Sequence, residues 1–337
     1  FQVEFSEVHC VWQGKADDKG FLVCGFGEIT TNLGEVQNNG FEFSLNTVNI
    51  SNSDFEWRTT FGFAYNKNQI KHLYYEYEDV LDENGNVVGR KEQDDTSNKW
   101  FIGKPIGEIW DYKVTGIWQT DEVEEAAKVG QKPGDPKVEN YYTADDKINA
   151  DGSRTPVYND NDKQFLGTTN APVRWSLRNE FTILKNIDFS FNLYSYMGHK
   201  SLEGYYLNND NGGSLMTYGF NTFKKDYWTP ENQNASSPRL IWTDPNRNAR
   251  SESDRYLESG SYFRLRNLQV GYTLPTVWFH GFVQKARVYV NAENLFTISS
   301  YSGYTPDVNS SDVYSRGFDE FIYPSNRTFM FGLNVTF

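Results

Sequence analysis

The stretch DFEWRTTFGFAY, residues 54–65, decides the fold of this chain because its side chains alternate strictly between two kinds. One set is large and mostly apolar and the other is small, polar or charged: Phe55, Trp57, Thr59, Phe61, Phe63 and Tyr65 against Glu56, Arg58, Thr60, Gly62 and Ala64. Successive side chains of a β-strand point to opposite faces of the sheet. The stretch therefore predicts a strand with one apolar face and one polar face.

The same two-residue period returns along the rest of the chain. In VRWSLRNEFTIL, residues 173–184, the apolar set is Val173, Trp175, Leu177, Phe181 and Ile183, and the polar set is Arg174, Ser176, Arg178, Glu180 and Thr182. Further alternating segments lie at 41–45, 110–115, 187–194, 268–274, 288–293 and 328–337. Only Lys185 and Asn186 separate the segment at 173–184 from the next one, which predicts a tight β-hairpin.

One segment near the C-terminus changes phase. Phe263 and Leu265 lie in the opposite phase to the apolar residues that follow, which begin at Leu268. One extra residue in a strand exchanges its two faces, so a β-bulge near Asn267 would restore the register.

Residues 67–106 do not show a single alternation of apolar and polar residues. Asn84–Gly85 predicts a hairpin turn, with apolar residues on both arms: Leu73, Tyr75 and Tyr77 before it and Val87 and Val88 after it. Ile70 and Tyr74 fall in the opposite phase, so the strand parity of this region stays open.

The composition excludes three classes of protein. Aromatic residues make up 17% of the 337 residues, whereas disordered chains are poor in aromatics. The mean hydropathy is -0.68 and no apolar run approaches the length of a spanning helix, which excludes a helical membrane protein. A net charge of -13 excludes a protein that binds the phosphate backbone of nucleic acid, which needs a basic surface.

The connections between the alternating segments are of two lengths. Those at 185–186 and about 275–284 are short, and those at about 119–172, 199–259 and 297–327 are long and polar. Several loops beyond about 15 residues are uncommon in compact soluble domains. Outer-membrane barrels combine short periplasmic turns with long extracellular loops. The pattern therefore predicts an all-β protein, an antiparallel transmembrane β-barrel.

A soluble β-sandwich produces the same alternation, because two sheets then bury their apolar faces against each other. Two features favour the barrel. Aromatic residues such as Phe55, Trp57 and Tyr65 lie near the segment ends, where the girdles of a membrane barrel lie. The polar faces mix Arg and Glu with Gly and Ser, as a hydrated interior does.

The chain resembles a known family over residues 30–337. SESDRYLESGSYFRLRNLQVGYTLP (251–275), VYVNAENLFTISSYSGYTPDV (288–308) and YPSNRTFMFGLNVTF (323–337) resemble the end of SusC/RagA-type TonB-dependent outer-membrane transporters. GEVQNNGFEFSLN (34–46) and IGKPIGEIWDYKVTGIWQTDEV (102–123) resemble upstream parts of the same family in the same order.

The resemblance implies a fold and a division of the chain. Members of the family have a barrel of 22 strands, a plug inside it and a TonB box. The chain resembles the C-terminal part of such a barrel, so we expect the remaining strands and the plug to be supplied from elsewhere. Residues 1–29 match no part of the family. Their two cysteines, Cys10 and Cys24, fit a cross-hairpin disulfide and buried thiols equally well.

The resemblance also implies a function. We expect TonB-dependent import of oligosaccharides or peptides across the outer membrane of a Gram-negative bacterium, with a SusD-like surface lipoprotein and the TonB complex as partners and outer-membrane lipid around the barrel. A soluble all-β carbohydrate-binding or hydrolytic module is one alternative, and a structural outer-membrane protein is another. No enzyme is expected, because the four histidines show no catalytic spacing.

Two groups of side chains are candidates for binding solute. The strand residues Arg174, Arg178 and Glu180 are predicted to face the lumen, where hydration of the wall is the alternative role. The loop aromatics are candidates for stacking on sugar rings or peptide side chains, with packing inside the loops as the alternative: Tyr205, Tyr206 and Trp228.

Calcium is the one cofactor that the resemblance suggests. Family members often carry an Asp- and Gly-rich loop after a Pro-Gly-Asp turn, and Pro133-Gly134-Asp135 is present here. Asp151, Asp160 and Asp162 are the candidate ligands. Calcium requires six to eight oxygens. The pattern is interrupted in this chain, which favours a solvated acidic loop over a metal site.

Overall fold

A computed structural model describes residues 8–13, 21–26, 34–202, 226–241, 252–279, 281–308, 317–319 and 322–337, the first two ranges as backbone only. The chain forms two compact units. One comprises Phe1–Asn39 and Lys67–Ile106, and the other comprises Gly40–Asn66 and Gly107–Phe337. The predicted boundary between residues 1–29 and the barrel segment stays a prediction.

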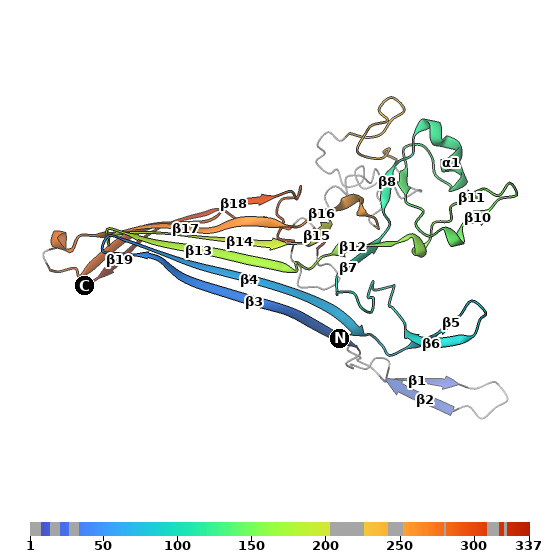
Figure 1. Ribbon diagram of the computed structural model, residues 1–337, viewed down its shortest axis with the longest axis horizontal. Coiled ribbons are helices and arrows are strands. Elements are labelled where there is room, and N and C mark those ends of the chain that lie inside the picture. Colours follow the sequence, from blue (N-terminus) through green and yellow to red (C-terminus); the bar gives the residue numbers. More distant parts are fainter. Residues whose placement is uncertain are drawn as a thin grey trace. The chain divides into compact units, whose positions relative to one another are not determined.

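An antiparallel sheet dominates the fold (Figure 1). Within the described residues it has seven strands in the order β19-β18-β17-β14-β13-β4-β3. Their bounds are β3 Glu35–Ser51, β4 Phe55–His72, β13 Val173–Ile183, β14 Ile187–Met197, β17 Tyr262–Leu274, β18 Lys285–Ser299 and β19 Thr328–Thr336. The predicted alternating segments are therefore confirmed as neighbouring strands of an all-β fold.

The register places like residues on like faces. Phe181 of β13 lies between Trp57 of β4 and Phe189 of β14, and its ring centroid is 5.8 Å from that of Trp57 and 5.6 Å from that of Phe189. One residue earlier, Glu180 lies between Arg58 and Ser190 on the opposite face. The sheet therefore has one aromatic face and one polar face, as the alternation predicts.

The predicted bulge in β17 is present. Asn192 of β14 pairs with Asn267, but the next residue of β14, Leu193, pairs with Leu265. Arg266 is therefore the extra residue, directly before the position that the sequence indicates. The bulge lets both halves of β17 present their apolar residues to the same face.

All short connections lie at one end of the sheet and all long ones at the other. The short connections are 52–54, 184–186 and 275–284, and the long ones are 73–172, 198–261 and 300–327. The turn after β13 has three residues rather than the predicted two, because Leu184 leaves the strand. Leu184 and Lys185 both have positive φ values, 50° and 63°, which turn the chain back sharply.

The aromatic face is not covered by a second sheet in the described part of the chain. Phe41 on β3 is 60% exposed and Phe331 on β19 is 81% exposed, while Trp57 and Trp175 are half-buried by their neighbours in the same sheet. A soluble sandwich buries such rings between its two sheets. The exposed aromatic face therefore fits a barrel wall in contact with lipid.

Short elements fill the long connections. They are β7 Glu108–Asp111, β8 Val114–Ile117, η1 Thr120–Glu122, α1 Val123–Lys128, β9 Pro136–Val138, η2 Thr143–Asp145, β10 Lys147–Ile148, β11 Arg154–Thr155, η3 Asp160–Asp162, β12 Gln164–Thr168, β15 Lys200–Leu202, η4 Asp254–Tyr256, β16 Leu257–Ser259 and η5 Thr276–Phe279. The alternation at 110–115 does not make one strand, because β7 ends before Tyr112. Among the residues that the structure describes, no helix has the length and apolar character needed to cross a membrane.

The described residues of the smaller unit form two hairpins. β1 Val8–Gln13 pairs with β2 Phe21–Phe26 and sets Cys10 opposite Cys24 in the backbone register. β5 Tyr77–Leu81 pairs with β6 Val87–Glu92 across the predicted turn at Asn84–Gly85.

The first arm of the second hairpin begins later than predicted, because β4 continues to His72. Ile70 and Leu73 instead form a small core with Trp100, and both are almost completely buried. This packing accounts for the opposite phase of Ile70 in the sequence.

Candidate functional site

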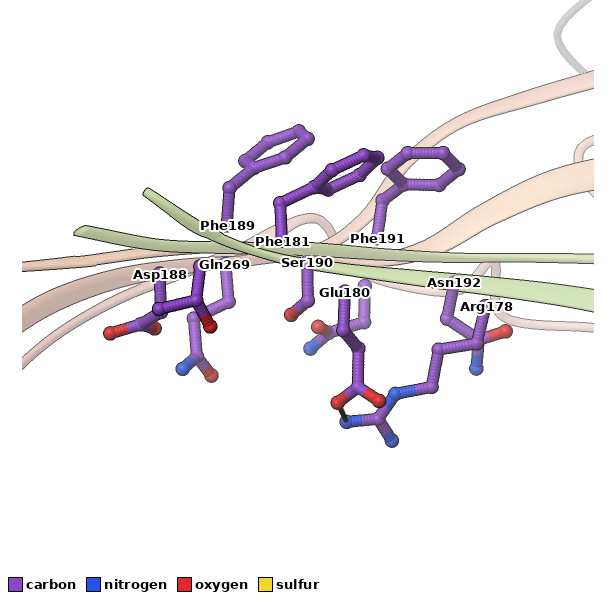
Figure 2. Close-up of a pocket in the computed structure, with 11 residues that line it drawn as sticks. Arg178, Glu180, Phe181, Asp188, Phe189, Ser190, Phe191, Asn192 and Gln269 are labelled. Atoms are coloured by element: carbon purple, nitrogen blue, oxygen red, sulfur yellow. Dashed lines mark hydrogen bonds and ion pairs between the residues drawn. The ribbon is translucent and has the colours of Figure 1, made fainter. Parts of the chain in front are cut away.

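The polar face of the sheet carries a hollow of about 440 Å³. Figure 2 shows Arg178, Glu180 and Gln269 projecting to one side of the sheet, whereas Phe181 and Phe191 project to the other. The polar residues that line the hollow come from β13, β14 and β17: Arg178, Glu180, Thr182, Asp188, Ser190, Asn192, Asn267 and Gln269. Strand alternation alone brings them together, because every second residue of each strand faces this side.

Uncharged amides form a ladder across the hollow and beyond it. The Asn267 side chain donates a hydrogen bond from Nδ2 to Oδ1 of Asn291 on β18, at 2.7 Å. Asn192 lies beside Asn267 in the register. Each amide offers both donors and an acceptor, and neutral groups of this kind match sugar hydroxyls and peptide groups.

Two ion pairs flank these amides and differ in burial. Arg178 contacts Glu180 at 2.6 Å, and their side chains are 55% and 45% exposed. An exposed pair of this kind stabilises a protein by at most about 1 kcal/mol, so both charges remain available to a solute.

The second ion pair is built into the wall. Arg287 of β18 donates from Nε to Oδ1 of Asp188 on β14 at 2.8 Å, although β17 lies between the two strands. The bridge crosses at Gly271, where an added Cβ would overlap both side chains. Glycine at this position is therefore required by the ion pair rather than by its own backbone.

Tyrosines gather where the sheet meets the long connections. The ring of Tyr262 on β17 stacks on Tyr196 at 5.7 Å and meets Tyr194 edge-on at 5.8 Å, both from β14. The Arg264 guanidinium lies 5.1 Å from the centre of the Tyr262 ring. We call these four residues the mouth cluster.

His199, the second residue after β14, is partly buried. Burial lowers the pKa of His199, which follows β14, and the negative charge of Asp307 opposes that shift only in part. Its Nδ1 atom is buried, and none of the described residues forms a hydrogen bond with it.

Two of the long connections are tied to each other. Asp135, completely buried, accepts a hydrogen bond from Nε of Arg239 at 2.7 Å. The hydroxyl of Thr120 donates to Gln233 at 2.9 Å. These contacts join the connection 73–172 to the connection 198–261, and we call them the loop clasp.

Comparison with known proteins gives the family. No family model matches the chain. The TonB-dependent receptor P3 of Formosa agariphila is 30% identical over 321 residues, which cover 93% of this chain and 30% of that protein. The TonB-dependent receptor SusC of Bacteroides thetaiotaomicron is 24% identical over 315 residues, or 92% of this chain and 27% of SusC. The chain belongs to the SusC-like TonB-dependent transporters.

Solved structures agree on the fold. The structure of the RagAB peptide transporter superposes with a TM-score of 0.67 at 18% identity, covering 98% of this chain and 38% of that one. The same importer in its "open-open" state gives a TM-score of 0.63. The SusC-like chain thus spans about a third of the length of the proteins that it matches, and its sheet is a segment of a transmembrane barrel wall.

The predicted solute-binding residues of the SusC-like chain fall into three groups. Arg174, Arg178 and Glu180 lie on the polar face, and the last two line the hollow. Trp228 is buried in the loop clasp, where its Nε1 donates to Gln119 at 3.1 Å, so its surroundings match the packing alternative. Tyr205 and Tyr206 lie outside the described residues.

The three candidate calcium ligands each have partners from the protein itself. Asp151 accepts hydrogen bonds from the backbone and hydroxyl of Ser153, and Asp160 contacts Lys163 at 2.8 Å. Asp162 is buried and accepts from the backbone N–H of Tyr142. The described part of the chain contains no group of three or more His, Cys, Asp or Glu placed to hold a metal ion. A calcium site here stays a prediction.

Proposed function

We propose that this chain forms part of the barrel of a TonB-dependent importer that carries oligosaccharides or peptides across the outer membrane of a Gram-negative bacterium. One observation carries the proposal. In the part of the chain that the structure describes, the sheet has an aromatic face without cover, a hollowed polar face and all its long connections at one end. A wall segment between lipid and a hydrated solute path has this combination.

The chemistry of the polar face supports a neutral, hydrogen-bonding solute. The amide ladder of Asn192, Asn267 and Asn291 offers donors and acceptors without net charge. The half-buried Tyr194 and Tyr196 of the mouth cluster offer aromatic surface at the end where solute would enter, whereas Tyr262 packs beneath them. Sugars and peptides both fit these groups, so the solute class is left at oligosaccharide or peptide.

Three partners complete the proposal. A SusD-like surface lipoprotein would bind at the end with the long connections, and the TonB complex would act through parts of the protein beyond this chain. Outer-membrane lipid would contact the aromatic face. The chain itself performs no covalent chemistry in this proposal, which agrees with relatives that are named as receptors and a transporter.

Uptake by whole cells tests the proposal. Cells with the complete gene, cells lacking it and cells lacking TonB would receive labelled oligosaccharides and peptides of the same size range. We expect one class of solute to enter only when both the gene and TonB are present. Equal uptake of every solute by the three strains would contradict import, and uptake that needs the gene but not TonB would indicate a passive channel.

A further inference from the structure

Arg264 is a buried arginine in the mouth cluster whose partners come from two different parts of the chain. It is 3% exposed. From the wall, Thr297 of β18 accepts from its Nε at 2.7 Å, and the hydroxyl of Tyr194 on β14 accepts from its Nη1 at 3.2 Å. These two bonds fix the guanidinium on the polar face of the sheet.

The remaining donors of Arg264 bind the connection between β18 and β19. Nη1 contacts the carboxylate of Asp307 and the hydroxyl of Ser325, and Nη2 contacts the hydroxyl of Thr305. The backbone N–H of Asp307 also donates to Thr305 at 3.4 Å. One side chain thus holds residues from the first and the last described parts of this connection.

The position of Arg264 shows which way the connection folds. Arg264 pairs with Tyr194 and Thr297 in the register, and both have side chains that reach it on the polar face. The connection leaves the sheet after Ser299, so it must bend inward across β18 to bring Asp307 to β17. Residues 301–308 therefore lie over the polar face.

This inward segment is well packed. Thr305 and Val308 are 4% and 8% exposed, and the hydroxyl of Tyr301 donates to Asp319 at 2.7 Å. At its base, the backbone N–H of Ser302 donates to Glu258 of β16 at 2.6 Å. Arg264 is buried and Asp307 is partly exposed, so loss of the Asp307 carboxylate would leave a buried charge uncompensated. The pair therefore holds the segment more firmly than its exposed contacts do.

We propose that Arg264 is a positioning residue that locks residues 301–308 over the polar face through Asp307, so that this segment narrows the solute path at the mouth of the barrel. The proposal deepens the proposed function, on which its transport part rests. In this proposal the locked segment limits the size of the solute, and the hollow below the segment binds the solute.

Hydrogen exchange in the complete transporter tests the lock without requiring transport. The variants are Arg264→Lys, which keeps the charge but loses the planar fork, and Asp307→Asn. Arg266→Lys is the matched control, because Arg266 is exposed at the bulge of the same strand. We expect exchange in residues 301–308 to rise by roughly 10-fold to 100-fold in both variants, as loss of a charged hydrogen bond predicts.

The control and the neighbouring strands define the opposite result. Exchange in β17 and β18 should stay unchanged in every variant, and Arg266→Lys should match the parent throughout. Unchanged exchange of residues 301–308 in both Arg264→Lys and Asp307→Asn would overturn the lock. If one variant fails to assemble in the outer membrane, the other decides.

Uptake of short and long solutes of one chemical class tests the constriction. We expect the ratio of long to short solute taken up to rise severalfold in Arg264→Lys and to stay at the parent value in Arg266→Lys. A parent protein that imports nothing would contradict the proposed function, and the exchange result would still decide the lock. Import with an unchanged ratio, despite a loosened segment, would overturn the constriction.

Discussion

The two edge strands of the sheet present different outward faces. The outward side chains of β19 are apolar along its whole length: Phe329, Phe331, Leu333 and Val335, followed by Phe337. On β3 the outward residues Phe41, Phe43 and Leu45 are followed by Thr47, Asn49 and Ser51, while Val48 and Ile50 turn to the other face. The apolar band therefore covers β19 entirely but stops partway along β3.

The register explains this difference. Thr59 near the start of β4 pairs with Asn179, and the same row of partners continues through Phe191, Leu268 and Ala292 to Phe329 at the start of β19. β4 starts at the short-turn end of the sheet and β19 at the opposite end. Strands of membrane barrels tilt by about 35–45°, so such a row slants across the membrane.

A polar group lies on the outward face near the short-turn end of the sheet, where we expect the periplasmic surface of the outer membrane. The side chain of Asn49 donates to Thr59 at 2.6 Å, and Asn179 accepts from Thr59 at 2.7 Å and from Nε1 of Trp57 at 2.8 Å. We call these four residues the outer polar group. Because the strands are tilted, residues of one row of paired partners lie at different depths in the membrane, and the edge of the hydrocarbon layer crosses that row.

The largest expected effect comes from placing a charge on each edge. Phe331→Arg on β19 should destabilise the barrel by about 2–4 kcal/mol, because the position lies in the hydrocarbon, whereas Thr47→Arg on β3 should cost only about 0–1 kcal/mol near the interface. Reversible unfolding of the complete protein in lipid vesicles measures both. Equal costs would refute the difference between the two edges.

At its far end, β4 is followed by residues whose backbone N–H groups donate to the carboxylate of Glu92, those of Leu73 and Tyr75. Burial by itself raises the pKa of the Glu92 carboxyl, but hydrogen bonds from His72 and from the backbone N–H groups of Leu73 and Tyr75 outweigh burial and leave the pKa below its ordinary value of 4.5. Such a carboxylate stabilises the fold above its unfolded pKa, and the stabilisation disappears as the pH falls through the folded pKa.

Acid should therefore loosen the end of β4. We expect hydrogen exchange of residues 70–76 to show a loss of about 1.5–3 kcal/mol in local stability below the folded pKa of Glu92, the size of a hydrogen bond to a charged group. Glu92→Gln should lack this pH dependence. The same acid-induced loss in the Gln variant would assign the effect to another group.

The outer polar group offers a sharper test of depth. Asn179→Leu should destabilise the barrel by about 1–3 kcal/mol, because the Trp57 N–H and the Thr59 hydroxyl lose their acceptor. Leu177→Val, on the same face of the same strand, serves as a control for packing. If the Leu variant is more stable than the parent, then Asn179 lies in the hydrocarbon and the slant is wrong.

The smallest effect on stability is expected on the polar face. Arg178→Gln should change stability by less than about 1 kcal/mol, because the pair with Glu180 is exposed. If Arg178 contacts the solute, the same variant should raise the half-saturation concentration for uptake. If uptake depends on solute concentration in the same way in the variant and the parent, Arg178 does not contact the solute and serves only to hydrate the wall.

Alternation predicts the parts of this fold that depend on neighbours in sequence. The two faces of β4 and β13 and the bulge beside Asn267 follow from side-chain order alone. The ion pair between Asp188 and Arg287 does not, because its members lie 99 residues apart and meet across an intervening strand. Arg264 escapes prediction for the same reason, since Asp307 reaches it only through the fold of a long connection.

Two other features of the structure could not be predicted from the sequence, each for a local reason. Asn179 stands on the apolar face, and a pattern search for apolar residues passes over it because its polar side chain is satisfied only by Trp57 and Thr59 of the next strand. Trp228 is a residue type that often stacks on sugar rings, and only the structure shows that it is buried and bonded to Gln119.

The loop clasp limits how the long connections can change during evolution or redesign, and with them the solute preference of the proposed importer. Arg239 from one connection neutralises the fully enclosed Asp135 of another, and Gln233 and Thr120 meet in the same way. Grafting one connection alone from a relative that lacks the matching Asp or Arg would leave a buried charge without its partner. Recombination between such transporters should therefore succeed when both connections are exchanged as one cassette.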